Sequence, residues 1–348
     1  MLISVYIPFL VTAALAVLAP PVAHRLPPRP AALALACAAL VTAAGWAGSL
    51  ALLAFTGVAQ IPQIAEEGRW SVSALRSQDP VYAVVAAVST LVLAGCVVSF
   101  GVAAVRQGRH LLRARRECAE LPGHTELAVL DDDVPLAFAL PGAPGRIVVS
   151  RGMLRRLGNA EREALLAHER AHLRGRHHVF QSVWRLTAAL NPLLRPVAVA
   201  GNFVLERWAD EDAAERVGDR TVVAHAVGRA ALASAGASRP TALAATGGVV
   251  PQRVRALLAP PPARRNLPLL AGGLLLVVCC ASLANAASDS DRMLDSAQWA
   301  LCTAHAATTA TTTATTAAAP TEHAGAPGHG PDRCCAGPDR PEHGQRHF

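Results

Sequence analysis

Five histidine and glutamate side chains lie within residues 167–178, which read AHERAHLRGRHH. His168 and His172 are four positions apart, and Glu169 directly follows the first of them. On a helix, residues four apart share one face, so both imidazoles could bind one zinc ion while Glu169 lies beside it without being a ligand. This spacing predicts two zinc-ligating histidines and a glutamate that serves as the catalytic base for zinc-activated water.

A solvated helix face with ion pairs would also explain this pentapeptide, because three fixed positions can arise by chance. A catalytic zinc site needs a third protein ligand and one open position. The segment ERWAD supplies Glu206 and Asp210, again four apart, after a turn expected at Asn191-Pro192. We therefore predict that Glu206 is the third ligand. We expect Asp210 to orient a ligating histidine by accepting a hydrogen bond from its other ring nitrogen.

Three further features keep two interpretations each. His177 and His178 either contact a ligand or a lipid phosphate, or have no role in the site. His225 either donates a hydrogen bond to the tetrahedral intermediate, beside zinc, or is structural. Residues 146–150 read as a strand that either pairs with extended substrate at the edge of a sheet or belongs to the core.

Four apolar stretches organise the rest of the chain, in which 52% of the residues are hydrophobic. Each stretch is near or above the roughly 20 residues that a helix needs to cross a bilayer. The first stretch has no basic residues ahead of it, which favours a retained span over a cleaved signal peptide. We expect four transmembrane helices, at about residues 1–18, 31–55, 81–105 and 266–288.

The arginines behind the net charge of +7 gather between spans one and two, after span three and before span four. Under the positive-inside rule, this predicts a multi-pass protein of the cell membrane with its N-terminus outside. Residues 106–265 would then be cytoplasmic, and the low-complexity, disordered tail at residues 289–348 would be outside. Because membrane orientation explains the basic charge, we expect the lipid bilayer as a partner and no direct binding of nucleic acid.

The segment 106–265 is expected to form one mainly helical α+β domain. A basic helical stretch opens it, and Asn159 is the expected N-cap of the helix that carries the paired histidines. The expected strands are residues 126–130, 136–140 and 146–150, and the expected later helices are residues 159–175, 180–190, 197–217 and 222–235.

The segments GRIVVSRGMLRRLGNAEREALLAHERAHLRGRHH, NPLLRP and ERWAD resemble the integral-membrane zinc metallopeptidases of the BlaR/MecR type. In that family, an H-E-x-x-H helix and a downstream E-x-x-[AC]-D motif lie in a cytoplasmic domain between the third and fourth transmembrane helices. The resemblance covers roughly residues 120–235 and implies a zincin-like catalytic domain. It also implies one Zn²⁺ per chain, bound by His168, His172 and Glu206, with Glu169 as the base.

The antibiotic-sensing members of that family carry a penicillin-binding sensor after the last span. Here a short Ala/Thr/Pro-rich segment follows, so a β-lactam sensor is not expected. We expect a membrane-bound zinc metalloendopeptidase that cleaves a protein substrate, with a cytoplasmic transcriptional repressor or signalling protein as the first candidate. The alternatives are a quality-control protease similar to the HtpX/Ste24 type, which shares both motifs, and a non-catalytic membrane receptor or scaffold.

Overall fold

The computed structural model describes residues 2–59, 61–68, 83–123, 125–237 and 249–260, with scattered positions between residues 270 and 303. These residues fall into two compact units. One unit holds residues 2–50 and 91–283 and contains the whole candidate site. Residues 51–90 belong to the other, which includes the short helix α3 (Pro62–Gly68).

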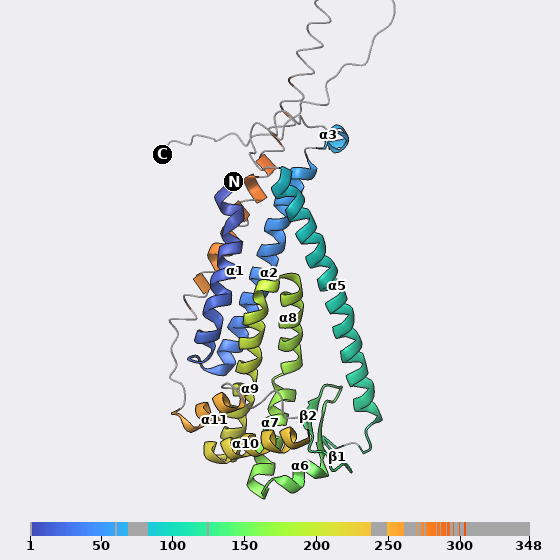
Figure 1. Cartoon of the computed structure of the whole chain (residues 1–348), viewed down its shortest axis with the longest axis vertical. Coiled ribbons are helices and arrows are strands. Elements are labelled where there is room, and N and C mark those ends of the chain that lie inside the picture. Colours follow the sequence, from blue (N-terminus) through green and yellow to red (C-terminus); the bar gives the residue numbers. More distant parts are fainter. Residues whose placement is uncertain are drawn as a thin grey trace, which may run out of the picture. The chain divides into compact units, whose positions relative to one another are not determined.

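In the described part of the chain, three long helices are apolar enough to cross a membrane (Figure 1). They are α1 (Leu2–Ala23), α2 (Pro28–Val58) and α5 (Ala83–Glu120), at the places of the first three expected spans. Large apolar side chains stay exposed on them, such as Val17 and Val98, which suits contact with lipid rather than water. These helices indicate a membrane protein. Helix α5 runs without a break through the arginine-rich stretch, so the boundary expected at residue 105 lies inside one helix.

The fourth expected span and the expected tail fall largely outside the described residues. A shorter apolar helix, Leu276–Asp289, is described only in part. The fourth span and the tail therefore stay predictions.

Three short strands form one sheet in the order β1-β3-β2. They are β1 (Leu127–Leu130), β2 (Ala137–Leu140) and β3 (Arg146–Ser150), each within one residue of its expected place. Strand β3 pairs in parallel with β1 and antiparallel with β2, and all five of its residues are buried. The interpretation of residues 146–150 as a substrate-binding edge is therefore wrong, because both edges of β3 are already paired. The strands at the two edges of this sheet are β1 and β2.

Between the sheet and residue 260, the described residues form six α-helices and one short 3-10 helix. The four expected helices are all present, and α6 and α11 were not expected. Their bounds are α6 (Arg151–Arg156), α7 (Asn159–Arg174), α8 (His177–Leu190), the 3-10 helix (Pro192–Leu194), α9 (Arg195–Val217), α10 (Arg220–Ala237) and α11 (Val249–Leu258).

Both ends of α7 are defined by local interactions. Gly158, rather than the expected Asn159, is the N-cap, and its backbone N–H donates to Glu161 Oε2 at 2.8 Å. At the other end, Arg176 has a left-handed backbone with φ 49°, which breaks the helix and starts α8 in a new direction. This reversal returns the first residue of α8, His177, to the side of α7.

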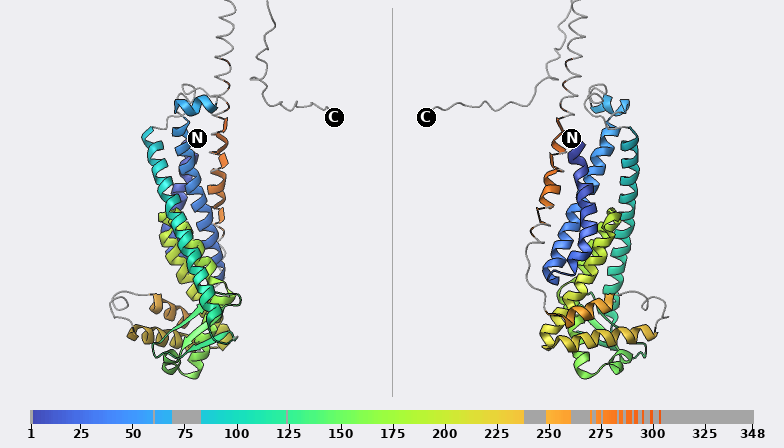
Figure 2. Two further views of the ribbon diagram at one scale, coloured as in Figure 1. Left: turned by 90° about the vertical axis from the view of Figure 1, so that its right-hand side faces the viewer. Right: turned by 60° about the vertical axis from the view of Figure 1, so that its left-hand side comes forward.

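Helices α8 and α9 form a hairpin that packs against α1 and the first part of α2 (Figures 1 and 2). At its closed end, the fully buried Asn191 donates from Nδ2 to Thr12 Oγ1 at 3.4 Å. Further along α9, the buried Arg207 donates to the backbone oxygens of Ala23 and Leu26. These hydrogen bonds satisfy carbonyl groups at the C-terminal end of α1 and in the turn that follows it. The α8–α9 hairpin therefore shares a hydrophobic core with the two N-terminal apolar helices.

Candidate metal centre

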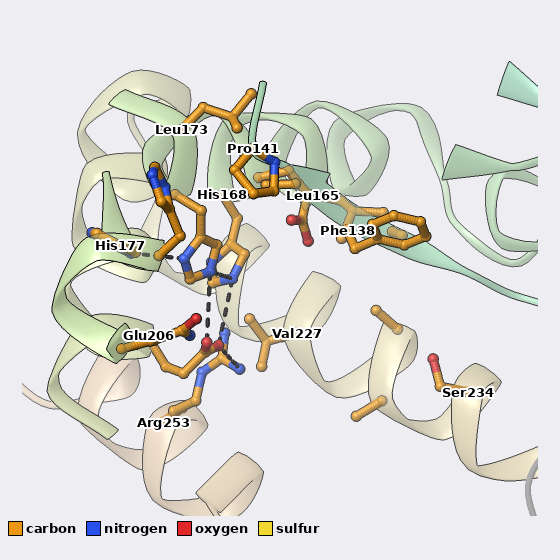
Figure 3. Close-up of a pocket in the computed structure, with 18 of the residues that line it drawn as sticks. Phe138, Pro141, Leu165, His168, Leu173, His177, Glu206, Val227, Ser234 and Arg253 are labelled. Carbon is orange, nitrogen blue, oxygen red and sulfur yellow. Dashed lines mark hydrogen bonds and ion pairs between the residues drawn. The ribbon is translucent and has the colours of Figure 1, made fainter. Parts of the chain in front are cut away.

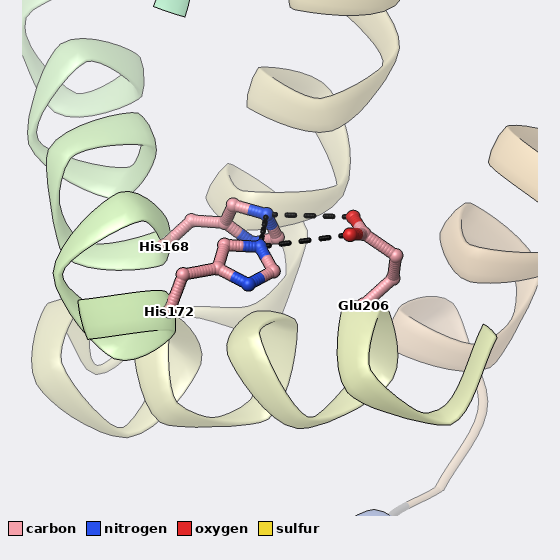
Figure 4. A group of neighbouring side chains, drawn as sticks. All are labelled: His168, His172 and Glu206. Carbon is pink, nitrogen blue, oxygen red and sulfur yellow. Dashed lines mark hydrogen bonds and ion pairs between the residues drawn. The ribbon is translucent and has the colours of Figure 1, made fainter. Parts of the chain in front are cut away.

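His168 and His172 project from α7 toward Glu206 on α9 (Figure 4). The two helices can approach closely because small side chains occupy their buried surfaces. These are Ala164, Ala167 and Ala171 on α7, and Ala209 and Ala213 on α9.

The spacing of the three side chains fits a zinc ion. His168 Nε2 lies 3.1 Å from His172 Nε2, and each of these atoms lies 3.6 Å from an oxygen of Glu206. Ligand bonds of about 2.0–2.2 Å in a tetrahedron place donor atoms about 3.3–3.6 Å apart. Two imidazoles and one glutamate are also a known ligand set of catalytic zinc. The chemistry and the geometry of the donors therefore both suit Zn²⁺.

The other ring nitrogen of each histidine has its own partner. His168 Nδ1 lies 3.0 Å from Asp210 Oδ1, where the sequence placed an orienting carboxylate. His172 Nδ1 lies 2.7 Å from Nδ1 of the buried His177. Burial, and then the neighbouring His172, lower the pKa of His177 to about 3, so His177 is neutral and can accept the His172 proton. Asp210 and His177 thus lie beside the two Nδ1 atoms, and both Nε2 atoms are left for a metal.

The contact between His172 and His177 leads to a prediction. Replacing His177 by phenylalanine keeps a ring beside Trp208 but removes the acceptor that orients His172. We expect the zinc affinity to fall about 10- to 100-fold, as for other partners of ligating histidines. Competition with a chelator measures it, and H177N, which restores an acceptor, should recover part of the loss. The matched control is H178F, one position along the chain, and equal affinities of H177F and H178F would contradict the prediction.

Figure 3 shows the cleft that His168 and Glu206 line. Glu169 lines the same cleft. The cleft has a volume of about 530 Å³, and β2 contributes Phe138 and Ala139 to its wall. Burial raises the pKa of the Glu169 carboxyl above its ordinary value, against the opposing effect of His168 and a backbone hydrogen bond with Ala139. A carboxylate in this state can take up a proton more readily than an exposed glutamate.

Arg253 on α11 is a site residue that sequence reasoning missed. Its guanidinium binds Asp210 through two hydrogen bonds of 2.8 and 2.6 Å, and Nη1 lies 2.8 Å from Glu206 Oε2. Burial alone would raise the pKa of Glu206, but His168 and Arg253 hold it well below its usual range. Arg253 was counted among the arginines that set membrane orientation. No motif marks it, because it follows Asp210 by 43 residues and reaches it only through tertiary packing.

Replacing Arg253 tests this contact through stability. In R253M, Glu206 and Asp210 lose a buried positive partner, and we expect the zinc-free protein to lose about 3–5 kcal/mol of stability. Bound zinc supplies positive charge at Glu206, so the loss should be smaller in the zinc-loaded protein. Unfolding in detergent, with zinc and with a chelator, measures the difference. The control is R255M on the exposed side of α11, and an equal loss in both metal states would speak against the prediction.

Of the remaining candidate histidines, one lies outside the cleft and one lines it. His225 is exposed on α10 and does not line the cleft, so its interpretation as a donor to the tetrahedral intermediate is wrong. Its neighbours Val223, Ala224 and Ala226 take the buried face of α10 instead. His178 lines the cleft and is half-buried, and its role as a ligand contact stays a prediction.

Two histidines and a glutamate whose donor atoms converge, with the buried Glu169 beside them in the same cleft, are the arrangement that a metallopeptidase needs. Residues 106–245 match the family model described as Peptidase family M48. The match supports a membrane-type zinc metallopeptidase with protease activity, and zinc dependence is implied by the family. The comparison with curated proteins and the comparison with solved structures give no match.

Proposed function

We propose that the chain is a membrane-bound zinc metalloendopeptidase that hydrolyses peptide bonds in protein substrates. The observation that carries this proposal is the convergence of His168, His172 and Glu206 beside the buried Glu169. When bound, zinc would supply a Lewis acid that polarises the substrate carbonyl and activates water. In this proposal, the Glu169 carboxylate accepts the proton of the attacking water and then passes it to the leaving amine.

The free edge of β2 is the proposed binding place of the substrate chain. Extended peptides bind exposed strand edges through main-chain hydrogen bonds. One edge of β2 is paired with β3, and the other faces the cleft with Phe138 and Ala139. Because Ala139 also contacts the Glu169 carboxyl, a peptide held on this edge passes directly beside the base.

Two biological roles fit this chemistry. The first is regulatory cleavage of a cytoplasmic repressor or signalling protein, which the resemblance to the BlaR/MecR type implies. The second is quality control of membrane proteins, as in the HtpX/Ste24 type. The match to family M48 is compatible with both. The packing of the α8–α9 hairpin against α1 favours the second role, because it brings the cleft near apolar helices that could lie beside a membrane-embedded substrate.

A comparison of protein N-termini in cells tests the function and separates the roles. Cells that carry the wild-type chain should contain new N-termini that are missing from cells with the E169Q variant. Cleavage sites in a soluble cytoplasmic regulator would support the first role, and sites next to apolar segments would support the second. If the two cell types have the same N-termini, and the purified zinc-loaded protein cleaves no peptide, the endopeptidase proposal fails.

We also propose that the protein lies in the plasma membrane with its N-terminus and tail outside and residues 106–265 in the cytoplasm. The three apolar helices and the arginines that follow the third support this topology. Reporter fusions after Arg116 and after Asp295 should report opposite sides of the membrane. Signals from the same side would refute it.

A further inference from the structure

We propose that this site selects acidic substrates, because three arginines of α5 bind carboxylate side chains of the peptide held on β2. The residues are Arg106, Arg109 and Arg113. The inference rests on the proposed function, since it assigns a substrate class to the same cleft.

The three arginines lie on one face of α5. Their spacing of three and four residues places them one above the other along the helix. Together they line a groove of about 610 Å³ whose opposite wall is the β2 segment, including Phe138 and Leu140. A side chain that leaves a peptide on the free edge of β2 toward α5 would therefore enter a groove lined by guanidinium groups.

This groove adjoins the metal cleft. His110, Phe138, Ala139 and Pro141 line both spaces, so the arginines lie next to the site along β2. A substrate strand that passes Glu169 along β2 would thus continue directly into the groove.

Helix α5 is held in place on both sides of the groove. Near its C-terminal end, Ala114 and Cys118 pack in one core with Leu140 of β2. One turn and more before them, Gln107 donates to Ser182 Oγ of α8 at 2.8 Å and accepts from Arg185 at 3.0 Å. The arginine face is therefore a fixed wall of the groove.

The arginine charges in the groove outnumber the acidic ones. Within the described part of the chain, no ion pair joins Arg106, Arg109 or Arg113 to a carboxylate. All three arginines are exposed, so they can reach a bound molecule. Glu117 is the acidic residue that lines this groove. Unpaired cations in a cleft attract oppositely charged segments and repel basic ones, which gives selectivity for acidic substrates.

Membrane lipid is the other partner that arginines after a span can bind. Arg113 lies seven residues beyond Arg106, which is about 10 Å along a helix. The headgroup layer beyond the hydrocarbon core is only about 5–8 Å thick. Lipid headgroups can therefore account for the arginine nearest the apolar part of α5, but less well for Arg113 beside the end of β2.

The test measures the binding of fluorescent peptides to the full-length, zinc-loaded E169Q protein, which does not turn them over. Two peptides differ only in glutamates that are replaced by glutamines. We expect tighter binding of the glutamate peptide, and a loss of roughly two- to fivefold in this preference for each arginine removed in R109Q, R113Q and their combination. Added salt should shrink the preference. The matched control, R116Q, is an exposed arginine of α5 that lines neither space and should keep the preference.

Each outcome decides between the two proposals. An unchanged preference in R109Q/R113Q overturns the acidic-substrate proposal, and hydrolysis of both peptides by the wild type would then leave the proposed function standing. If the preference depends on the arginines but the zinc-loaded wild type hydrolyses neither peptide, the acidic-substrate groove is supported and the proposed peptidase function is refuted. The same measurements in vesicles of phosphatidylcholine, with and without phosphatidylserine, address lipid. If the double variant changes only the response to phosphatidylserine, the arginines bind lipid and the proposal is wrong.

Discussion

The E169Q variant is expected to lose peptide hydrolysis by about 10²- to 10⁴-fold in kcat while it keeps its zinc. The amide has the size of the carboxylate, so packing around this buried position is preserved. It cannot accept the proton of the attacking water, however, and it has no proton to return to the leaving amine. Steady-state kinetics on a quenched peptide and metal analysis of the same sample measure both quantities.

The matched control for E169Q is E163Q, an exposed glutamate on the same helix, which should keep full activity. The pH profile gives a second check. Burial raises the pKa of Glu169 above its ordinary value, and the base works only when it is ionised. Therefore kcat/KM of the wild type should fall as the pH drops through this raised pKa, at a higher pH than for an ordinary glutamate. A variant with unimpaired kcat, or a residual activity of E169Q with the same acid limb, would exclude Glu169 as the base.

The H168A variant is expected to lose both the metal and all zinc-dependent hydrolysis. Its imidazole is one of three donors, and two donors cannot complete a site that needs three protein ligands. The zinc content found by metal analysis should fall from about one ion per chain to near zero. Zinc at 100 times its dissociation constant stabilises a folded protein by about 2.7 kcal/mol, so the rise in Tm on zinc addition should also disappear.

H225A is the control for this loss, because it removes an exposed imidazole that lies outside the cleft. H172A and E206Q should behave like H168A, since each removes one donor of the same cluster. If H168A keeps a normal zinc content and a normal shift in Tm, the assignment of the metal site is wrong.

The sequence by itself determined what depends on local periodicity. Three apolar helices, three strands and four helices of residues 106–265 occur where their patterns predict them. The spacing of His168 and His172 and of Glu206 and Asp210 is also local, because a helix places residues four apart on one face. The prediction that Glu206 lies beside the two histidines, however, required the assumption that α7 and α9 pack against each other.

Only the tertiary structure decided which distant residues meet. The order β1-β3-β2 turns residues 146–150 from a possible edge into a central strand, because pairing between strands is not encoded in their own alternation. His177 reaches His172 through the left-handed backbone of Arg176, and Arg253 reaches Asp210 across 43 residues. Such contacts depend on how helices pack. Which side chains make them is determined by the tertiary structure and not by the neighbouring residues in the sequence. For this reason the candidate donors and Asp210 could be read from the sequence, whereas His177 and Arg253 could not.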